Sequence, residues 1–228
     1  SNLGLVDLEK PYTCEFCHKN FSRESTLTSH SCEAKRRHQS QNQPEVKRAL
    51  QAFQAFHQSL NPRSRVLRSF EEFLASGLYP IFVKFGSWSL ENRVQEFPTL
   101  LDWLIRSGKK PQDWCDLNTY QEYLRDLLLS ESSEQALKRS LGTLEAWSRD
   151  SAQPFSEFFR ACNSNVIVSW ITSGRISGWL LYNAPSALDF FERCNPEQLN
   201  LVQAAVPHVK WKILFSRNQV VADAIRDS

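Results

Sequence analysis

The chain has 228 residues, of which 41% are hydrophobic and 12% aromatic. This composition is typical of a folded globular protein and excludes an intrinsically disordered one. The formal net charge of +2 is nearly neutral, so it does not by itself indicate a nucleic-acid-binding protein. No stretch approaches about 18 uninterrupted apolar residues, and the first residues lack an apolar signal core, so neither a transmembrane helix nor a signal peptide is predicted.

A metal-binding segment is predicted over residues 12–38, after a tail at 1–11. Cys14 and Cys17 are separated by two residues, and His30 follows Cys17 after twelve. Two thiolates on a turn and a later imidazole on a helix are typical ligands of tetrahedral zinc. A segment this short cannot bury a core of its own, so it needs the bound metal in order to fold. A redox Cys-x-x-Cys pair would instead open a helix in a βαβ unit, and no such unit follows.

The fourth ligand is either Cys32 or His38. One residue separates Cys32 from His30. Positions i and i+2 do not share a helix face, so Cys32 can bind only if the helix unwinds or tightens immediately after His30. His38 could bind only through a longer loop that crosses the basic residues between His30 and His38. The strong binding of zinc by thiolate and the shorter loop favour Cys32. The predicted cofactor is therefore Zn²⁺, held by Cys14, Cys17, His30 and Cys32.

These residues, together with Phe21 and Leu27, resemble a C2H2 zinc finger with cysteine at the fourth position. The resemblance implies a small ββα unit in which Phe21 and Leu27 form an apolar plug beneath the metal. It also implies that Arg23, Thr26 and Ser29 occupy the helix positions that contact successive bases. Arg23 could pair with guanine, whereas Thr26 and Ser29 discriminate poorly. The alternative interpretation is that all three are ordinary residues of a helix surface.

The excess of positive over negative residues lies in the part of the chain that contains the predicted finger. Residues 1–48 hold 8 Lys/Arg against 6 Asp/Glu, and the remainder of the chain is balanced. Lys35, Arg36 and Arg37 concentrate this excess and could contact phosphates, which adds affinity but reads no sequence.

A polar linker is expected over residues 39–45, followed by an all-α domain over 46–228. Apolar residues recur there at helical spacing. The predicted helices cover 46–60, 62–76, 79–90, 98–107, 117–129, 134–148, a short segment from Pro154, 164–173, 185–193, 196–206 and 207–226. Three of them end at Ser-Gly, but no side-chain signature recurs with the glycines, so the prediction is an irregular multi-helix domain.

Three other segments are candidate contact sites. The first is the basic group Arg63, Arg65 and Arg68, for which pairing of Arg68 with the following glutamates along a helix is the simpler interpretation. The second is Lys210-Trp211-Lys212 with Arg217, for which a half-buried core position of Trp211 is favoured over a platform for base stacking. The third is the turn at 175–179, for which a plain connection between helices is favoured. No enzyme motif is present, and the spacing of Asp113 and Asp116 equally suits a loop and a helix cap, so no enzyme is predicted.

The whole chain resembles zinc-finger proteins encoded by large contractile-tailed bacteriophages, through residues 12–38, 82–86 and 174–177. This resemblance implies action in the cytoplasm of a bacterial host and brings no settled biochemical role. The scattered cysteines Cys115, Cys162 and Cys194 also indicate a reducing compartment.

Two functions are therefore expected. The first is a zinc-dependent accessory protein that binds nucleic acid, most simply DNA, while the helical domain adds a second surface or recruits a partner. The alternative is a protein-interaction adaptor whose finger docks on a replication, transcription or virion protein. No small-molecule substrate and no membrane partner is indicated.

Overall fold

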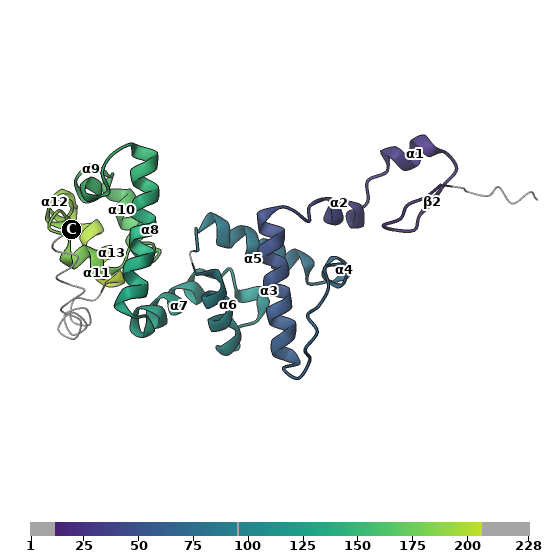
Figure 1. Ribbon diagram of the computed structural model, residues 1–228, viewed down its shortest axis with the longest axis horizontal. Helices are drawn as coiled ribbons and strands as arrows, with labels where there is room; N and C mark the ends of the chain where they lie inside the picture. The colour runs from purple at the N-terminus through teal and green to yellow at the C-terminus, as the bar shows by residue number, and fades with distance from the viewer. Residues whose placement is uncertain (1–11, 95, 207–228) are drawn as a thin grey trace, which may run out of the picture. The chain divides into compact units, whose positions relative to one another are not determined.

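The computed structural model describes residues 12–94 and 96–206 (Figure 1). The expected tail at 1–11, the helix over 207–226 and the group around Trp211 lie outside these residues. The predicted class is confirmed: a small ββα finger precedes a part of the chain that is built from helices. The elements run β1 (Tyr12–Thr13), β2 (Asn20–Phe21), α1 (Glu24–Ser29), α2 (Glu33–Gln39), α3 (Pro44–Leu60), α4 (Phe70–Ala75), α5 (Tyr79–Glu91), α6 (Phe97–Arg106), η1 (Pro111–Asp113), α7 (Leu117–Ser130), α8 (Ser133–Ser151), η2 (Phe155–Glu157), α9 (Phe158–Ala161), α10 (Ser164–Thr172), α11 (Gly178–Asn183), α12 (Ala187–Arg193) and α13 (Pro196–Ala205).

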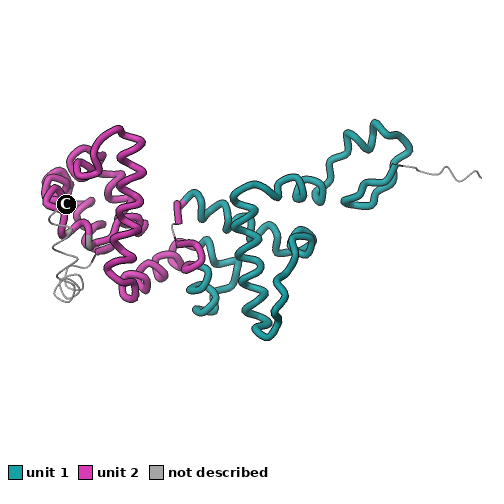
Figure 2. Tube along the Cα trace, in the orientation of Figure 1, with its two compact units in different colours: residues 1–91, 101–115 teal, residues 92–100, 116–228 magenta. Residues whose placement is uncertain are grey.

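The chain divides into two compact units, whereas the sequence predicted one helical domain after the finger (Figure 2). Unit 1 comprises residues 1–91 and 101–115, and unit 2 comprises 92–100 and 116–228. The finger belongs to unit 1 because α2 packs against α4.

Unit 1 is centred on the packing of α3 against α5. Phe53 of α3 lies edge-on to Phe82 of α5, with ring centroids 5.8 Å apart, and both side chains are buried. A Cβ placed on Gly86 would lie 2.2 Å from the carbonyl oxygen of Glu45, so only glycine permits this close approach of the two helices. Trp114 closes the core, and its indole N–H donates to the carbonyl of Lys109 at 2.9 Å. Burial of aromatic side chains at helical spacing is therefore what stabilises this unit.

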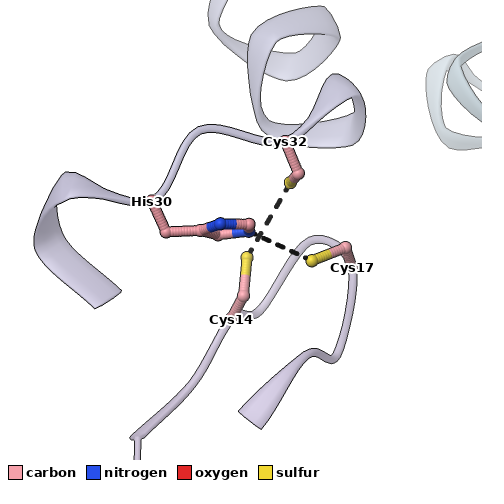
Figure 3. A group of neighbouring side chains, drawn as sticks. All are labelled: Cys14, Cys17, His30 and Cys32. Atoms are coloured by element: carbon pink, nitrogen blue, oxygen red, sulfur yellow. Dashed lines mark hydrogen bonds between the residues drawn. The ribbon is translucent and has the colours of Figure 1, made fainter. Parts of the chain in front are cut away.

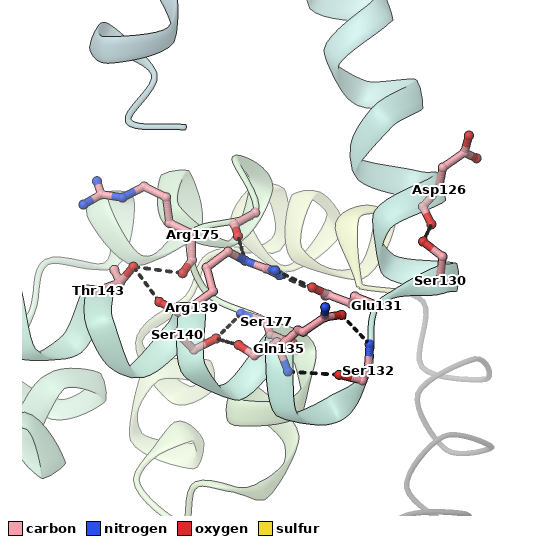
Figure 4. A network of polar contacts seen from close by, with 12 residues as sticks. Asp126, Ser130, Glu131, Ser132, Gln135, Arg139, Ser140, Thr143, Arg175 and Ser177 are labelled. Carbon is pink, nitrogen blue, oxygen red and sulfur yellow. Dashed lines mark hydrogen bonds and ion pairs between the residues drawn. The ribbon is translucent and has the colours of Figure 1, made fainter. Parts of the chain in front are cut away.

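Unit 2 is organised around the long helix α8 and contains a buried ion pair (Figure 4). Arg139 of α8 pairs through both terminal nitrogens with Glu131, and the two side chains are only 5% and 2% exposed. The Nε–H of Arg139 donates to the carbonyl oxygen of Gly174 at 2.7 Å. Gly174 has a φ of +76°, which ends α10 and favours glycine. The pair thus fixes the α10–α11 connection onto α8.

The turn at 175–179 is a connection, as the simpler interpretation of the sequence held. Arg175, Ile176 and Ser177 are buried. The backbone N–H of Ser177 donates to the hydroxyl of Ser140 at 2.8 Å, and Thr143 donates to the carbonyl of Arg175 at 3.0 Å (Figure 4). From Gly178 the chain enters α11, a helix that the sequence analysis did not predict.

The predicted helix over 62–76 is wrong in its first half. Residues 61–69 have no regular structure, and α4 begins at Phe70. Ser69 starts it with a capping box, in which the Ser69 hydroxyl accepts from the N–H of Glu72 and the Glu72 carboxylate accepts from the N–H of Ser69. A capping box satisfies two backbone donors at a helix start, which explains why the helix begins at this point and not at Pro62.

Candidate metal centre

The hairpin of the finger presents the first two cysteines. Tyr12 pairs with Phe21 across the two strands, and the N–H of Cys14 donates to the carbonyl of Lys19 at 2.9 Å. The tight turn between the strands places His18 at a φ of +58°, with its N–H bonded to the carbonyl of Cys14 at 2.8 Å. This turn brings Cys14 and Cys17 to the same side of the hairpin, and the exposed His18 side chain takes no part in the group.

The third and fourth residues of the group flank a break between two short helices. α1 ends at Ser29, and His30 follows in an extended conformation with φ −67° and ψ 125°. Cys32 is then the N-cap of α2. The chain therefore leaves the helical conformation at His30, which allows Cys32 to reach the other ligands.

The four side chains converge with the spacing that a tetrahedral metal ion requires (Figure 3). The ligand atoms of Cys14, Cys17, His30 and Cys32 all lie within 4.8 Å of one another. The sulfurs of Cys14 and Cys32 are 4.0 Å apart, and the sulfur of Cys17 lies 3.3 Å from Nε2 of His30. Two sulfurs at about 2.3 Å from a tetrahedral ion would be about 3.8 Å apart, so the observed distances fit such a centre.

Backbone N–H groups point at the sulfurs. The N–H of Lys35 donates to the Cys32 sulfur at 3.4 Å. Hydrogen bonds from the backbone of Cys17, and to a lesser degree of Phe16, lower the pKa of the Cys14 thiol. Hydrogen bonds to the charged form favour the thiolate, which is the form that binds a metal. The turn therefore favours the thiolate of Cys14. The pKa of the Cys17 thiol is raised instead: a backbone hydrogen bond from Lys19 lowers it, but burial and the neighbouring sulfurs of Cys14 and Cys32 outweigh that bond.

Phe21 packs directly against the imidazole of the group. Its ring centroid lies 4.7 Å from that of His30, and both side chains are half-buried. Leu27, the other residue of the predicted plug, is also half-buried. Phe21 thus restricts the orientation of the His30 ring, with Nε2 directed toward Cys17.

His38, the alternative fourth ligand, lies elsewhere. Its ring centroid is 5.1 Å from that of Phe16 and 6.4 Å from that of Phe70. It therefore forms part of the contact between the finger and α4, and among the described residues the clustered ligand atoms come from Cys32 instead.

The residues predicted to contact bases lie on one short helix and are exposed. Arg23 is the N-cap residue of α1 but makes no side-chain cap, and Thr26 lies in its middle. The hydroxyl of Ser29 donates to the carbonyls of Ser25 and Thr26 at 2.9 and 3.3 Å, so its proton is engaged within the helix.

The basic residues of α2 differ in their surroundings. Lys35 is half-buried, and its ammonium donates to the carbonyl of His30 at 3.3 Å. Arg36 is exposed and makes no side-chain hydrogen bond or ion pair in the described part of the chain. Arg37 donates to the carbonyls of Leu74 and Ser76 at 2.7 and 3.4 Å, at the end of α4.

Arg37 is the functional residue whose role the sequence did not show. Its guanidinium carbon also lies 4.3 Å from the centroid of the Tyr79 ring, and it pairs with Glu33 one turn earlier. It therefore fastens α2 to the end of α4. The four-residue spacing of Glu33 and Arg37 is the one sequence signal for the ion pair. Nothing in the sequence indicated that Arg37 also donates hydrogen bonds to carbonyls at the end of α4.

No protein-family model matches the chain, and neither a curated protein nor a solved structure shows significant similarity to it. The resemblance to bacteriophage proteins therefore stays a prediction. In the described residues no helix is long and apolar enough to cross a membrane.

Proposed function

We propose that the chain is a zinc-dependent nucleic-acid-binding protein whose finger contacts DNA. The observation that carries this proposal is the group of three sulfurs and one imidazole nitrogen, all within 4.8 Å, at the junction of a hairpin and a short helix. Thiolate and imidazole ligands in a closed tetrahedral group select zinc over magnesium and calcium, which prefer oxygen ligands. Four protein ligands leave no position for a reacting water, so the proposed role of the metal is structural.

The finger exposes cationic side chains beside this centre. Arg23 at the start of α1 and Arg36 on α2 are both exposed, and no described carboxylate pairs with either. Arg23 occupies the position from which fingers reach a base, and Arg36 is placed to contact a phosphate. Lys35 and Arg37 contribute less to the proposed contact, since both are engaged inside unit 1.

Fluorescence anisotropy of labelled duplex DNA tests this proposal on the zinc-loaded full chain. We expect binding that weakens steeply with salt, and Arg23→Gln with Arg36→Gln should weaken it and flatten the salt dependence. The paired substitutions Arg125→Gln and Arg149→Gln, at exposed positions of unit 2, remove the same charge and serve as the control. Absence of binding at low salt, or binding that survives Cys14→Ser unchanged, would overturn the proposal.

A protein-interaction adaptor is the second candidate. The observation that favours it is that the chain itself engages Ser29 and Arg37, two of the residues predicted to face nucleic acid. Under this proposal the finger docks on a partner protein, and affinity capture with the wild-type chain and with Cys14→Ser should recover different partners. An unchanged set of partners after metal loss would contradict it.

A further inference from the structure

The segment between α3 and α4, residues 61–69, is an ordered loop and not a loose connection. We call it the α3–α4 loop. Two glutamines of α3 hold its backbone: Gln58 donates to the carbonyl of Ser64 at 2.6 Å, and Gln54 donates to the carbonyl of Arg68 at 2.8 Å. The capping box at Ser69 then fixes the end of the loop. The loop backbone is therefore attached to both helices.

The side chains of the α3–α4 loop nevertheless point into solvent. Val66 is 80% exposed and Leu67 is 58% exposed, and they are the two aliphatic side chains of the loop besides Pro62. Exposed apolar side chains that occur singly need no explanation, but here two stand in succession on a backbone that is held in place. The hydrogen bonds that hold the backbone thus present an apolar pair outward.

The charge of the α3–α4 loop is positive, and only that of Arg68 is paired with a described carboxylate. It contains no aspartate or glutamate. Arg68 pairs with Glu72 at 2.6 Å, as predicted, although Arg68 lies in the loop and not on a helix. Arg63 and Arg65 are exposed and have no carboxylate within ion-pair distance in the described residues. Two free cations therefore flank the apolar pair on its N-terminal side.

The loop and the finger are attached to the same helix. α4 starts directly after the loop, and the ring of Phe70 at this start lies 6.4 Å from that of His38 on α2. At the other end of α4, Arg37 of α2 bonds to the carbonyl of Leu74. Because α2 begins at the proposed metal ligand Cys32, the metal centre and the loop are linked through two packed helices.

We propose that the α3–α4 loop is a second nucleic-acid contact, in which Arg63 and Arg65 bind backbone phosphates and Val66 with Leu67 packs against sugars and base edges. An apolar pair beside arginines is the chemistry that minor-groove binders present to duplex DNA. The inference rests on the proposed function of the finger, and it supplies the additional surface that a single finger covering about three base pairs requires. An acidic protein partner is the other occupant that this charge would suit, and the experiment distinguishes it.

The test measures anisotropy of labelled duplex DNA against salt for the zinc-loaded full chain and its variants. Each lost phosphate contact lowers the salt slope by about 0.9, so Arg63→Gln with Arg65→Gln should lower it by roughly 2. Val66→Ser with Leu67→Ser should weaken binding severalfold and leave the slope unchanged, because an apolar contact releases no counterions. Arg125→Gln with Arg149→Gln is the charge-matched control, and all these positions are exposed, so thermal unfolding should stay unchanged.

The outcomes separate this inference from the function of the finger. If the two loop arginine substitutions leave affinity and slope at the wild-type values while Arg23→Gln with Arg36→Gln weakens binding, the loop inference is overturned and the finger proposal stands. Weakening by the loop substitutions alone supports the loop and overturns the finger contact. A wild-type chain that binds no DNA overturns both and leaves the loop to a protein partner.

Discussion

The sulfur of Cys32 accepts a hydrogen bond from the backbone N–H of Lys35, 3.4 Å away, so one side chain serves both the metal group and the start of α2. α2 is held against α4 through Arg37 and His38. Loss of the metal is therefore expected to affect the attachment of the finger to the rest of unit 1, and not the finger alone.

Replacement of Cys32 separates its two roles. Cys32→Ser keeps an N-cap acceptor for α2 but replaces a thiolate ligand with a poor one. Loss of a residue that only hydrogen-bonds to a metal ligand lowers metal affinity roughly 10–100-fold. Loss of the Cys32 thiolate, a direct ligand, should lower it by more. Competition with a chromophoric chelator measures this affinity. His38→Ala is the matched control, and a large loss of affinity in that variant instead would assign the fourth ligand to His38.

Arg37 should stabilise unit 1 through its contacts with α4. Arg37→Gln removes the hydrogen bonds to Leu74 and Ser76 and the stacking on Tyr79, so we expect a loss of about 1–3 kcal/mol in the free energy of unfolding. Arg36→Gln on the next position of the same helix changes the same charge on an exposed side chain and should stay within about 0.5 kcal/mol. Equal effects in urea unfolding would show that Arg37 does not fasten α2.

The buried pair of Glu131 and Arg139 should be costly to break on one side. Glu131→Gln leaves a buried guanidinium without its charge partner, and we expect unit 2 to lose about 3–5 kcal/mol of stability. The exposed pair of Arg68 and Glu72 is the comparison. Glu72→Gln should cost at most about 1 kcal/mol, because it removes an exposed ion pair and glutamine can keep the capping box. Thermal denaturation measures both, and a smaller loss for Glu131→Gln than for Glu72→Gln would be inconsistent with the described burial.

Tyr120 gives unit 2 a sensitivity to high pH. Burial raises the pKa of its hydroxyl from 10.0 to about 12, while the charge of Arg139 acts weakly in the opposite direction. A group with a raised folded-state pKa contributes its full stability below its unfolded pKa and loses it as the pH rises to the folded value. We therefore expect stability to decline from about pH 10 to about pH 12, with less decline in Tyr120→Phe.

The ultraviolet absorbance of phenolate checks this prediction. In the native chain part of the tyrosine signal should titrate well above pH 10, and in urea all of it should titrate together near the ordinary value. Coincident titration of the native and unfolded chains would show that Tyr120 is accessible to water.

The sequence predicted most of the helices and the ligand group because both depend on local spacing. Apolar periodicity located α3, α5 and α8, and the choice of Cys32 as a ligand required the helix to unwind or tighten after His30. The start of α4 was missed because Val66 and Leu67 continue an apolar helical pattern, although both are exposed in the structure.

The remaining differences come from long-range contacts. Arg37 and Leu74 are 37 residues apart, and Arg139 and Gly174 are 35 apart, so neither hydrogen bond leaves a local signal in the sequence. The division into two units likewise depends on which helices pack together, and α6 contributes residues to both. Hydrogen bonds and helix contacts between distant residues depend on the tertiary fold, which apolar periodicity does not specify.

The central claim is that one zinc ion is held by Cys14, Cys17, His30 and Cys32. The most direct measurement is elemental analysis of the purified chain combined with the visible spectrum of the cobalt-substituted protein. We expect one zinc per chain and the intense bands of tetrahedral cobalt with three sulfur ligands. Cys32→Ser should change these bands to those of cobalt with two sulfur ligands. A chain without stoichiometric metal, or a cobalt spectrum that Cys32→Ser leaves unchanged, would contradict it.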